Sequence, residues 1–297
     1  MRDIIIVPTY DRPEMLWVCL EKLRAARGIG ENKEIWICED KHYEKEKDGW
    51  LTFEYATLLP YFEREFGRYM FRHFYFEPHG PSYGNSRNVV DGFKRAIVEY
   101  LAKQDVRYIY LIEDDAMVTE DFFEWNEKAH DLFKPFATCA GRINRSLNFE
   151  SNGPEAIDET FKEPGLCVRS RKAYMSWATC FHPEDLRNAM TYEFTSTVWA
   201  PGKEQDIEVQ KRIRKLNLTT VWPYVPRAYH MGWYSYHLNS GMPLSGTLEE
   251  KVKAIKRIMT NASAIRDVAG LAQIDPYPTK PIAWDSRAPL QIRGDYK

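Results

Sequence analysis

The sequence lacks the cysteine patterns of disulfide-bonded and zinc-binding proteins. Its five cysteines are scattered, odd in number and never arranged as C-x-x-C. Neither a disulfide framework nor a zinc knuckle is therefore expected. Cys19 and Cys38 lie in apolar segments and are predicted to be small core residues, which favours a reducing, cytoplasmic compartment.

Long apolar runs are also missing. No stretch approaches the ~20 apolar residues that a membrane-spanning helix needs. The N-terminal run 4–7 ends at Pro8 and is too short for a signal peptide. We therefore expect no association with a membrane.

A strong net charge is the third missing feature. The formal charge is −2, so no global field would recruit a polyanion. Nucleic-acid binding would need a local basic face, although such clusters are more often ordinary solvated surface. Candidate clusters are Arg142 with Arg145, Arg169 with Arg171 and Lys172, and Lys211 with Arg212, Arg214 and Lys215.

The first half of the chain alternates apolar β-branched runs with helical patterns. Strands are predicted at 3–7, 34–38, 72–77 and 108–112, and helices after Asp11, at 52–66 and at 85–101. The second helix contains Pro60, which predicts a kink or break. The third carries an apolar stripe of Val89, Phe93, Ile97 and Leu101. This βαβ rhythm predicts a parallel sheet with right-handed crossovers.

The second half is less regular. Short strands are predicted at 136–141, 165–168 and 177–181, and helices at 183–190, 205–216 and 248–262. The stretch 274–297 has many prolines and few periodic apolar residues. We expect it to wrap the surface or to be partly disordered.

An acidic triplet, Glu113-Asp114-Asp115, directly follows the predicted strand 108–112. Three carboxylates at the end of a buried strand repel one another and lose solvation, so they need compensation. Mg²⁺ or Mn²⁺, which bind carboxylate and phosphate oxygens, would supply it. The alternative is a helix N-cap, because Thr119-Glu120-Asp121 follows closely.

Other polar groups follow the remaining strands. In an open α/β sheet, groups at the carboxyl ends of the strands meet at the edge where ligands bind. This convergence is more specific than any single motif. The segments are Pro8-Thr9-Tyr10-Asp11-Arg12 after the first strand, Glu39-Asp40 after the second, and Gly84-Asn85-Ser86-Arg87-Asn88 at the start of the long helix.

This order of motifs resembles the GT-A glycosyltransferases, and most closely their inverting, family 2-like group. The resemblance covers about the first 120 residues well and the rest weakly. The Asp-x-Asp signature of that family appears here as Glu113-Asp114-Asp115. The resemblance implies an α/β, GT-A (Rossmann-like) fold, with a mostly parallel sheet, helices on both faces and a smaller mixed acceptor-side region.

The same resemblance implies an organisation in three parts. Residues 1–120 would form the nucleotide-sugar-binding half of the domain. Residues 121–270 would form its acceptor-binding and catalytic-base half, and 271–297 a Pro-rich tail.

It also implies site residues for the donor. Tyr10 would stack on the base, Asp40 would accept from the uracil N3–H, and Arg87 would reach the diphosphate or sugar. The alternatives are helix capping and surface charge for Thr9 and Arg12, and a salt bridge to Asp91 for Arg87. The implied donor-binding set is Pro8, Thr9, Tyr10, Arg12, Asp40, Arg87, Glu113 and Asp114.

Asp115 and His230 are the implied metal ligands, and Asp206 is the implied base. Asp206 precedes Ile207 in a stretch resembling the family's Gly-x-Glu-Asp-Ile pattern, with Glu204 as the second candidate. The base would deprotonate an acceptor hydroxyl. The alternatives are an exposed helix start for 204–208, and a hydrogen-bonded core residue for His230. His237 is a second candidate ligand.

The resemblance implies a UDP-sugar donor and Mn²⁺ or Mg²⁺. Two acceptors stay open. One is 5-hydroxymethylpyrimidine in double-stranded DNA, as in bacteriophage genome modification in a host cytoplasm, and the other is a surface-glycan precursor or a protein. A non-catalytic nucleotide-sugar or glycan-binding module, and a metal-dependent hydrolase or nuclease, are the competing classes. Some aromatic residues could hold an extruded base or a sugar ring, or could simply fill the core: Trp199, Trp222, Trp233, Tyr234 and Tyr236.

Overall fold

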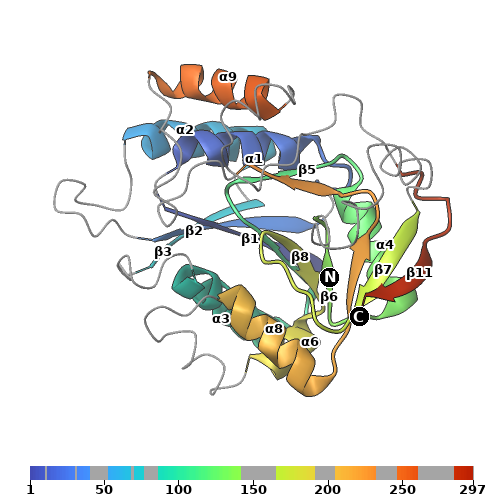
Figure 1. Cartoon of the computed structure of the whole chain (residues 1–297). Helices are drawn as coiled ribbons and strands as arrows, with labels where there is room; N and C mark the ends of the chain where they lie inside the picture. Colours follow the sequence, from blue (N-terminus) through green and yellow to red (C-terminus); the bar gives the residue numbers. More distant parts are fainter. Residues whose placement is uncertain are drawn as a thin grey trace.

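The structure, a computed structural model, is built around one large sheet (Figure 1). Among the described residues, nine strands of this sheet lie in the order β11-β7-β9-β6-β8-β4-β1-β2-β3, and β5 pairs with β10 in a separate two-stranded sheet. The residues described are 1–10, 12–30, 32–40, 53–67, 70–76, 86–141, 165–190, 205–231, 246–259 and 284–296.

The strands are β1 Arg2–Thr9, β2 Lys33–Asp40, β3 Phe71–Phe76, β4 Val106–Ile112, β5 Ala116–Val118, β6 Ala137–Cys139, β7 Leu166–Ser170, β8 Ala178–Phe181, β9 Thr220–Pro223, β10 Ala228–His230 and β11 Gln291–Tyr296. The helices are α1 Pro13–Ala25, α2 Phe53–Phe66, α3 Ser86–Lys103, α4 Phe122–Phe133, α6 Pro183–Ala189, α8 Gln205–Leu216 and α9 Leu248–Met259.

The predicted parallel sheet is confirmed. β4, β1, β2 and β3 are neighbours in parallel pairs, and β6 and β9 run in the same direction. β8 lies antiparallel between β4 and β6, and β7 lies antiparallel to β9, so the sheet is mostly parallel and mixed on the second-half side.

Helices cover both faces of the sheet, as predicted. In Figure 1, α1, α2 and α9 lie above the sheet, while α3, α6 and α8 lie below it. Because successive strand side chains point to opposite faces, β1 supplies both cores. Ile5 and Val7 pack in the cluster with α1 and α9, and Ile4 and Ile6 pack in the cluster with α3.

Three local expectations in the first half are corrected. α2 continues through Pro60, so the predicted break is absent, while a kink at this position stays a prediction. Leu101 does not share the buried stripe of α3, because it is 49% exposed while Val89 and Phe93 are buried. α1 is preceded by Arg12 as its N-cap residue, without a side-chain cap bond, and Asp11 lies outside the described residues.

The C-terminal segment also differs from expectation. Gln291–Tyr296 forms β11, which pairs in parallel with β7 at the edge of the large sheet. Upstream of it, buried Trp284 donates its backbone N–H to Asp121 Oδ2 at 2.9 Å. The C-terminal segment is therefore packed against the start of α4 before it joins the sheet.

No helix in the described ranges combines the length and the apolar character that crossing a membrane requires. All five cysteines are buried free thiols, which confirms the prediction that Cys19 and Cys38 are core residues.

Candidate functional site

The site is built where β4 ends. Five apolar residues of β4, from Tyr108 to Ile112, are buried, and the acidic triplet follows immediately. The backbone then turns, because the N–H of Ala116 donates to the carbonyl of Glu113 at 3.0 Å. This turn separates β4 from β5 and places the triplet at the carboxyl edge of the sheet.

A second segment brings a histidine to the same turn. β10 pairs antiparallel with β5, and this register places His230 opposite Ala116. The backbone N–H of Met231 donates to the carbonyl of Asp115 at 2.6 Å, which fixes the two chains together. The predicted proximity of His230 to the acidic triplet therefore follows from the pairing of β5 with β10.

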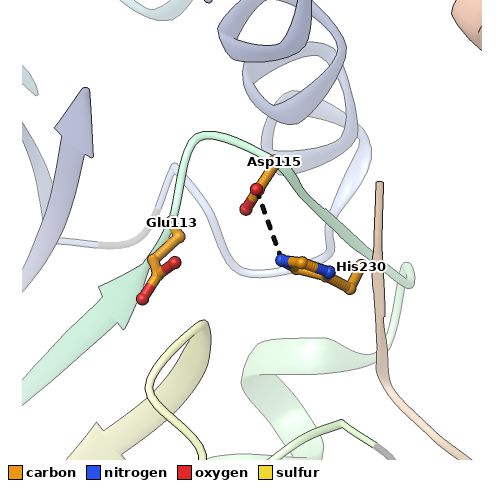
Figure 2. A group of neighbouring side chains, drawn as sticks. All are labelled: Glu113, Asp115 and His230. Carbon is orange, nitrogen blue, oxygen red and sulfur yellow. Dashed lines mark ion pairs between the residues drawn. The ribbon is translucent and has the colours of Figure 1, made fainter. Parts of the chain in front are cut away.

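Glu113, Asp115 and His230 form a compact cluster (Figure 2). One ligand-type atom of each residue lies within 4.8 Å of the other two. His230 Nε2 is 3.3 Å from Asp115 Oδ2. In the described ranges, this is the one group of three or more acidic, histidine or cysteine side chains close enough to share a metal ion.

Arg12 compensates the charge of the triplet. Its guanidinium donates to Asp114 Oδ1 at 2.5 Å and to Asp115 Oδ2 at 2.6 Å. The hydroxyl of Thr9 donates to Asp114 Oδ2 at 2.8 Å. Thr9 and Asp114 are each 1% exposed, so these two predicted donor-binding residues contact each other inside the protein.

The three acids of the triplet have different pKa values. Burial, reinforced by the charge of Asp115, raises the pKa of Glu113 to about 7. Burial raises the pKa of Asp114 to about 6, although Arg12 opposes the increase. Burial also disfavours ionised Asp115, but Arg12 and His230 outweigh it and hold the pKa of Asp115 well below its usual range.

The pKa values of the two basic side chains, His230 and Arg12, are both raised. Burial would lower the pKa of His230, but the carboxylates of Asp115 and Glu113 outweigh it and raise that pKa. Burial likewise opposes the charge of Arg12, and Asp114 and Asp115 raise its pKa above the ordinary value. The cluster thus favours positive charge beside Asp115.

The donor set fits a divalent cation. Two carboxylates and one imidazole are ligand types that suit Mn²⁺. Asp115 Oδ1 is a buried oxygen with no hydrogen-bond partner among the described residues, and such an atom ordinarily has one. Asp115, His230 and also Glu113 are therefore the residues that could hold the ion.

The ends of β1, β2 and β4 meet at this edge. Asn88, near the start of α3, donates from Nδ2 to the carbonyl of Cys38 at 2.7 Å and to that of Thr9 at 3.3 Å. Together with the bond from Thr9 to Asp114, these contacts join all three strand ends. The predicted convergence of the strand-end motifs is confirmed for these residues.

For the other residues predicted to bind the sugar donor, the structure gives the position in the fold and, for most, the burial. Pro8 is buried in β1, Tyr10 and Arg87 are half-buried, and Asp40 is the last residue of β2, paired with Phe76. Asp91, the alternative partner of Arg87, lies 3.6 Å from Lys94.

The candidate base lies at the N-terminus of α8. Asp206 is half-buried, and its Oδ1 accepts the backbone N–H of Ile207 at 2.7 Å. Burial raises the pKa of Tyr174, and the charges of Asp206 and Glu113 raise it further. Glu204, the second candidate, lies outside the described residues.

Other predicted residues fall outside the described ranges or away from the site. Trp222 is 2% exposed inside the protein, so it cannot stack on a base or a sugar. Arg142, Arg145, Trp199, Trp233, Tyr234, Tyr236 and His237 are not described.

Two site residues were not found by sequence reasoning. Ser176 donates from Oγ to Glu113 Oε1 at 2.7 Å. The ring of Trp177 lies 5.4 Å from that of His230, centroid to centroid. Neither residue belongs to a recognisable motif, and only the arrangement of the strands brings them here.

No protein-family model and no curated protein sequence matches this chain. Among solved structures, TarS 1–349 of S. aureus in complex with UDP-GlcNAc has a TM-score of 0.50 at 12% identity, covering 88% of this chain and 67% of that one. TarS 1–349 in another crystal structure gives 0.47 at 12% identity, covering 75% of this chain and 58% of that one.

The mannosyltransferase PcManGT of Pyrobaculum calidifontis, in complex with GDP-Man and Mn²⁺, gives a TM-score of 0.48 at 11% identity, covering 92% of this chain and 76% of that one. This chain spans 58%, less than two thirds, of the TarS chain in the second of the two TarS structures. At such low identity the likeness concerns the fold. Together with the mostly parallel sheet and its helices on both faces, the TarS complex shows that this chain has the GT-A fold.

Proposed function

We propose that this chain is a metal-dependent, inverting glycosyltransferase that moves a sugar from a UDP-sugar to a hydroxyl group. The observation that carries the proposal is the cluster of Glu113, Asp115 and His230 at the carboxyl edge of a GT-A sheet. In open α/β sheets that edge is where ligands bind. Carboxylates and an imidazole there suit a cation that in turn binds phosphate oxygens.

The donor is proposed to be a UDP-sugar. The TarS structure with the same fold holds UDP-GlcNAc, and here the ends of β1 and β2 supply Tyr10 and Asp40 at the carboxyl edge of the sheet. The carboxylate of Asp40 would accept from the uracil N3–H, which neither adenine nor cytosine offers in that form. Arg87, half-buried near the start of α3, would contact the diphosphate or the sugar.

Glu113, Asp115 and His230 would hold Mn²⁺ or Mg²⁺, which would neutralise the charge that develops on the departing UDP. Arg12 keeps Asp115 ionised and holds its carboxylate in place from the side of α1. Thr9 and Asp114 are each 1% exposed, so their proposed part in donor binding would be indirect: Thr9 bonds to Asp114, and Asp114 pairs with Arg12.

Asp206 would act as the base. It removes the proton of the acceptor hydroxyl while that oxygen bonds to the anomeric carbon and the bond from that carbon to UDP breaks. Attack opposite the leaving group inverts the anomeric configuration, and the proton ends on the Asp206 carboxylate. The half-buried position of Asp206 at the start of α8 supports this role, as does the fact that the charges of Asp206 and Glu113 both act on Tyr174.

For the acceptor, we propose the hydroxymethyl group of a modified pyrimidine in DNA, with the cytoplasm as the compartment. The support comes from the sequence: the half that would hold the acceptor contains both clusters of arginines and aromatic residues such as Trp199 and Trp233. A surface-glycan precursor or a protein is the alternative. It follows from the same aromatics, which also stack on sugar rings.

Purified protein should be incubated with Mn²⁺, individual UDP-sugars and DNA containing either cytosine or 5-hydroxymethylcytosine. UDP release and the masses of the digested nucleosides are then measured. A sugar-sized mass gain confined to the hydroxymethylated base, abolished by EDTA, supports the proposal. Transfer to a glycan or peptide instead replaces the acceptor, whereas UDP-sugar binding without any transfer identifies a non-catalytic module.

A further inference from the structure

The short segment between β7 and β8 contacts two of the three candidate metal ligands from outside the cluster. Ser176 donates to Glu113 Oε1 at 2.7 Å, so one oxygen of that carboxylate is held by the hydroxyl. The backbone carbonyl of Trp177 accepts from the N–H of Glu113 at 3.0 Å. The position and the rotation of the Glu113 carboxylate are thus both fixed by neighbouring residues of one segment.

Trp177 also covers the third ligand. Its ring lies 5.4 Å from the imidazole of His230 with an interplanar angle of 38°, within the range of a favourable aromatic contact. His230 carries a second restraint, its ion pair with Asp115. The imidazole therefore contacts both an aromatic ring and a carboxylate.

The position of Trp177 depends on Gly141. A Cβ at residue 141 would overlap the six-membered ring of Trp177 and would lie 2.8 Å from Met175 Sδ. Gly141 is buried directly after Ala140, whose carbonyl accepts the N–H groups of Arg227 and Ala228 at the start of β10. The absence of a side chain here leaves the space that the tryptophan ring occupies beside His230.

The same segment contacts the helix that carries the candidate base. Gln210 of α8 donates from Nε2 to the carbonyl of Tyr174 at 3.2 Å. Residues 174–177 thus contact α8 at one end and the metal ligands at the other. A displacement of this segment would move both.

We infer that Ser176 and Trp177 are positioning residues, which orient Glu113 and His230 for a divalent cation and thereby set the affinity of the metal site. Partners of this kind around metal ligands fix the orientation of the coordinating groups, and their loss typically lowers metal affinity by ~10–100-fold. The inference rests on the proposed metal-dependent function and extends it to side chains that would never touch the ion.

The test is a Mn²⁺ titration in which free Mn²⁺ is measured by electron paramagnetic resonance. We expect Ser176→Ala, Trp177→Leu and Gly141→Ala each to raise the Kd for Mn²⁺ by ~10–100-fold. Ser176→Thr and Trp177→Phe, which keep the hydroxyl and an aromatic ring, should retain most of the affinity. Ser286→Ala, at an exposed serine, and Trp17→Leu, at a tryptophan stacked on Tyr61 in another part of the fold, are the matched controls.

Sugar transfer by the same variants should fall at low Mn²⁺ and recover at saturating Mn²⁺. Unchanged Kd values overturn the inference. A loss of affinity that merely follows a loss of melting temperature in EDTA overturns it too, because the effect is then structural. If the natural sequence binds no Mn²⁺, the metal site and the inference both fail. If Mn²⁺ binds as expected but no sugar is transferred, only the proposed function fails.

Discussion

Arg12 donates a 2.6 Å hydrogen bond to Asp115, and the same guanidinium reaches Asp114 at 2.5 Å. One cation from the start of α1 thus faces two nearly buried carboxylates at the end of β4. The acidic triplet is compensated in part by the protein itself, before any metal binds.

The first prediction concerns this pairing. Arg12→Met should destabilise the protein by about 3–5 kcal/mol, because it leaves buried carboxylates without their partner. Mn²⁺ should then stabilise the variant more than the natural sequence, since the ion supplies the missing positive charge. Urea unfolding with EDTA and with Mn²⁺ measures both effects.

The control for Arg12 is Arg27→Met. Arg27 forms an exposed pair with Glu124 at 2.7 Å, and such pairs contribute below about 1 kcal/mol. An equal gain from Mn²⁺ in the natural sequence and in the Arg12 variant would contradict the idea that arginine and metal act on the same carboxylates.

The second prediction concerns Asp115. Asp115→Asn should lower sugar transfer by roughly 10²–10³, because a ligand charge that stabilises the departing diphosphate is lost. Repulsion among the three acids alone would predict a gain in stability for this variant. The ion pairs of Asp115 with Arg12 and His230 predict a loss instead, measurable by urea unfolding in EDTA.

Asp285→Asn, at an exposed aspartate, is the comparison for Asp115. Full activity of the Asp115 variant, or of the natural sequence in excess EDTA, would remove the metal from the proposed mechanism.

The third prediction separates the candidate bases. Asp206→Asn should leave UDP-sugar affinity unchanged and lower kcat by roughly 10²–10⁴. A collapse of donor affinity would mean that Asp206 binds the donor or supports the start of α8. If Glu204→Gln shows the large kcat loss and Asp206→Asn does not, the roles of the two acids are exchanged.

The fourth prediction tests the uridine preference. With Mn²⁺ present, UDP should raise the melting temperature by several degrees, and by more than GDP or ADP. Asp40→Ala should remove this difference, because Asp40 at the end of β2 is the proposed acceptor for the uracil imide. Equal shifts for all three nucleotides in the natural sequence would count against that role.

The first half of the fold was predictable because buried parallel strands are continuous apolar runs, as residues 108–112 illustrate. The strands β5 and β10 have three residues each, too few for a periodic pattern to show. β11 was missed because it is an edge strand with the polar sequence QIRGDY, which buries little.

The site residues also fall into two groups, those that the sequence predicted and those that it did not. Asp115 was identifiable because three carboxylates at the end of a buried strand need compensation, and His230 because the resemblance to GT-A glycosyltransferases implied it. Gly141, Ser176 and Trp177 are ordinary residues in sequence. Their relation to the ligands depends on β8 lying between β4 and β6, a tertiary pairing that no local pattern specifies.

The fifth prediction lies away from the site, at His130 of α4. Burial lowers the pKa of His130 from 6.5 to about 4, and its ring contacts the carbonyl of Cys180 at 2.9 Å. The folded state therefore resists a proton that the unfolded chain accepts. His130 therefore does not lower the free energy of unfolding above pH 6.5. As the pH falls from 6.5 towards 4, it lowers that free energy progressively, by up to on the order of 3 kcal/mol.

His130→Gln keeps an N–H group that can reach the carbonyl of Cys180 but cannot take up a proton. The free energy of unfolding, measured in urea between pH 7.5 and 4, should fall less steeply for this variant than for the natural sequence. Acidic groups that titrate in the same range affect both proteins alike, so the difference between the two curves isolates His130. Parallel curves for the natural sequence and the His130 variant would show that the buried ring is already charged, or that it becomes solvated on protonation without unfolding.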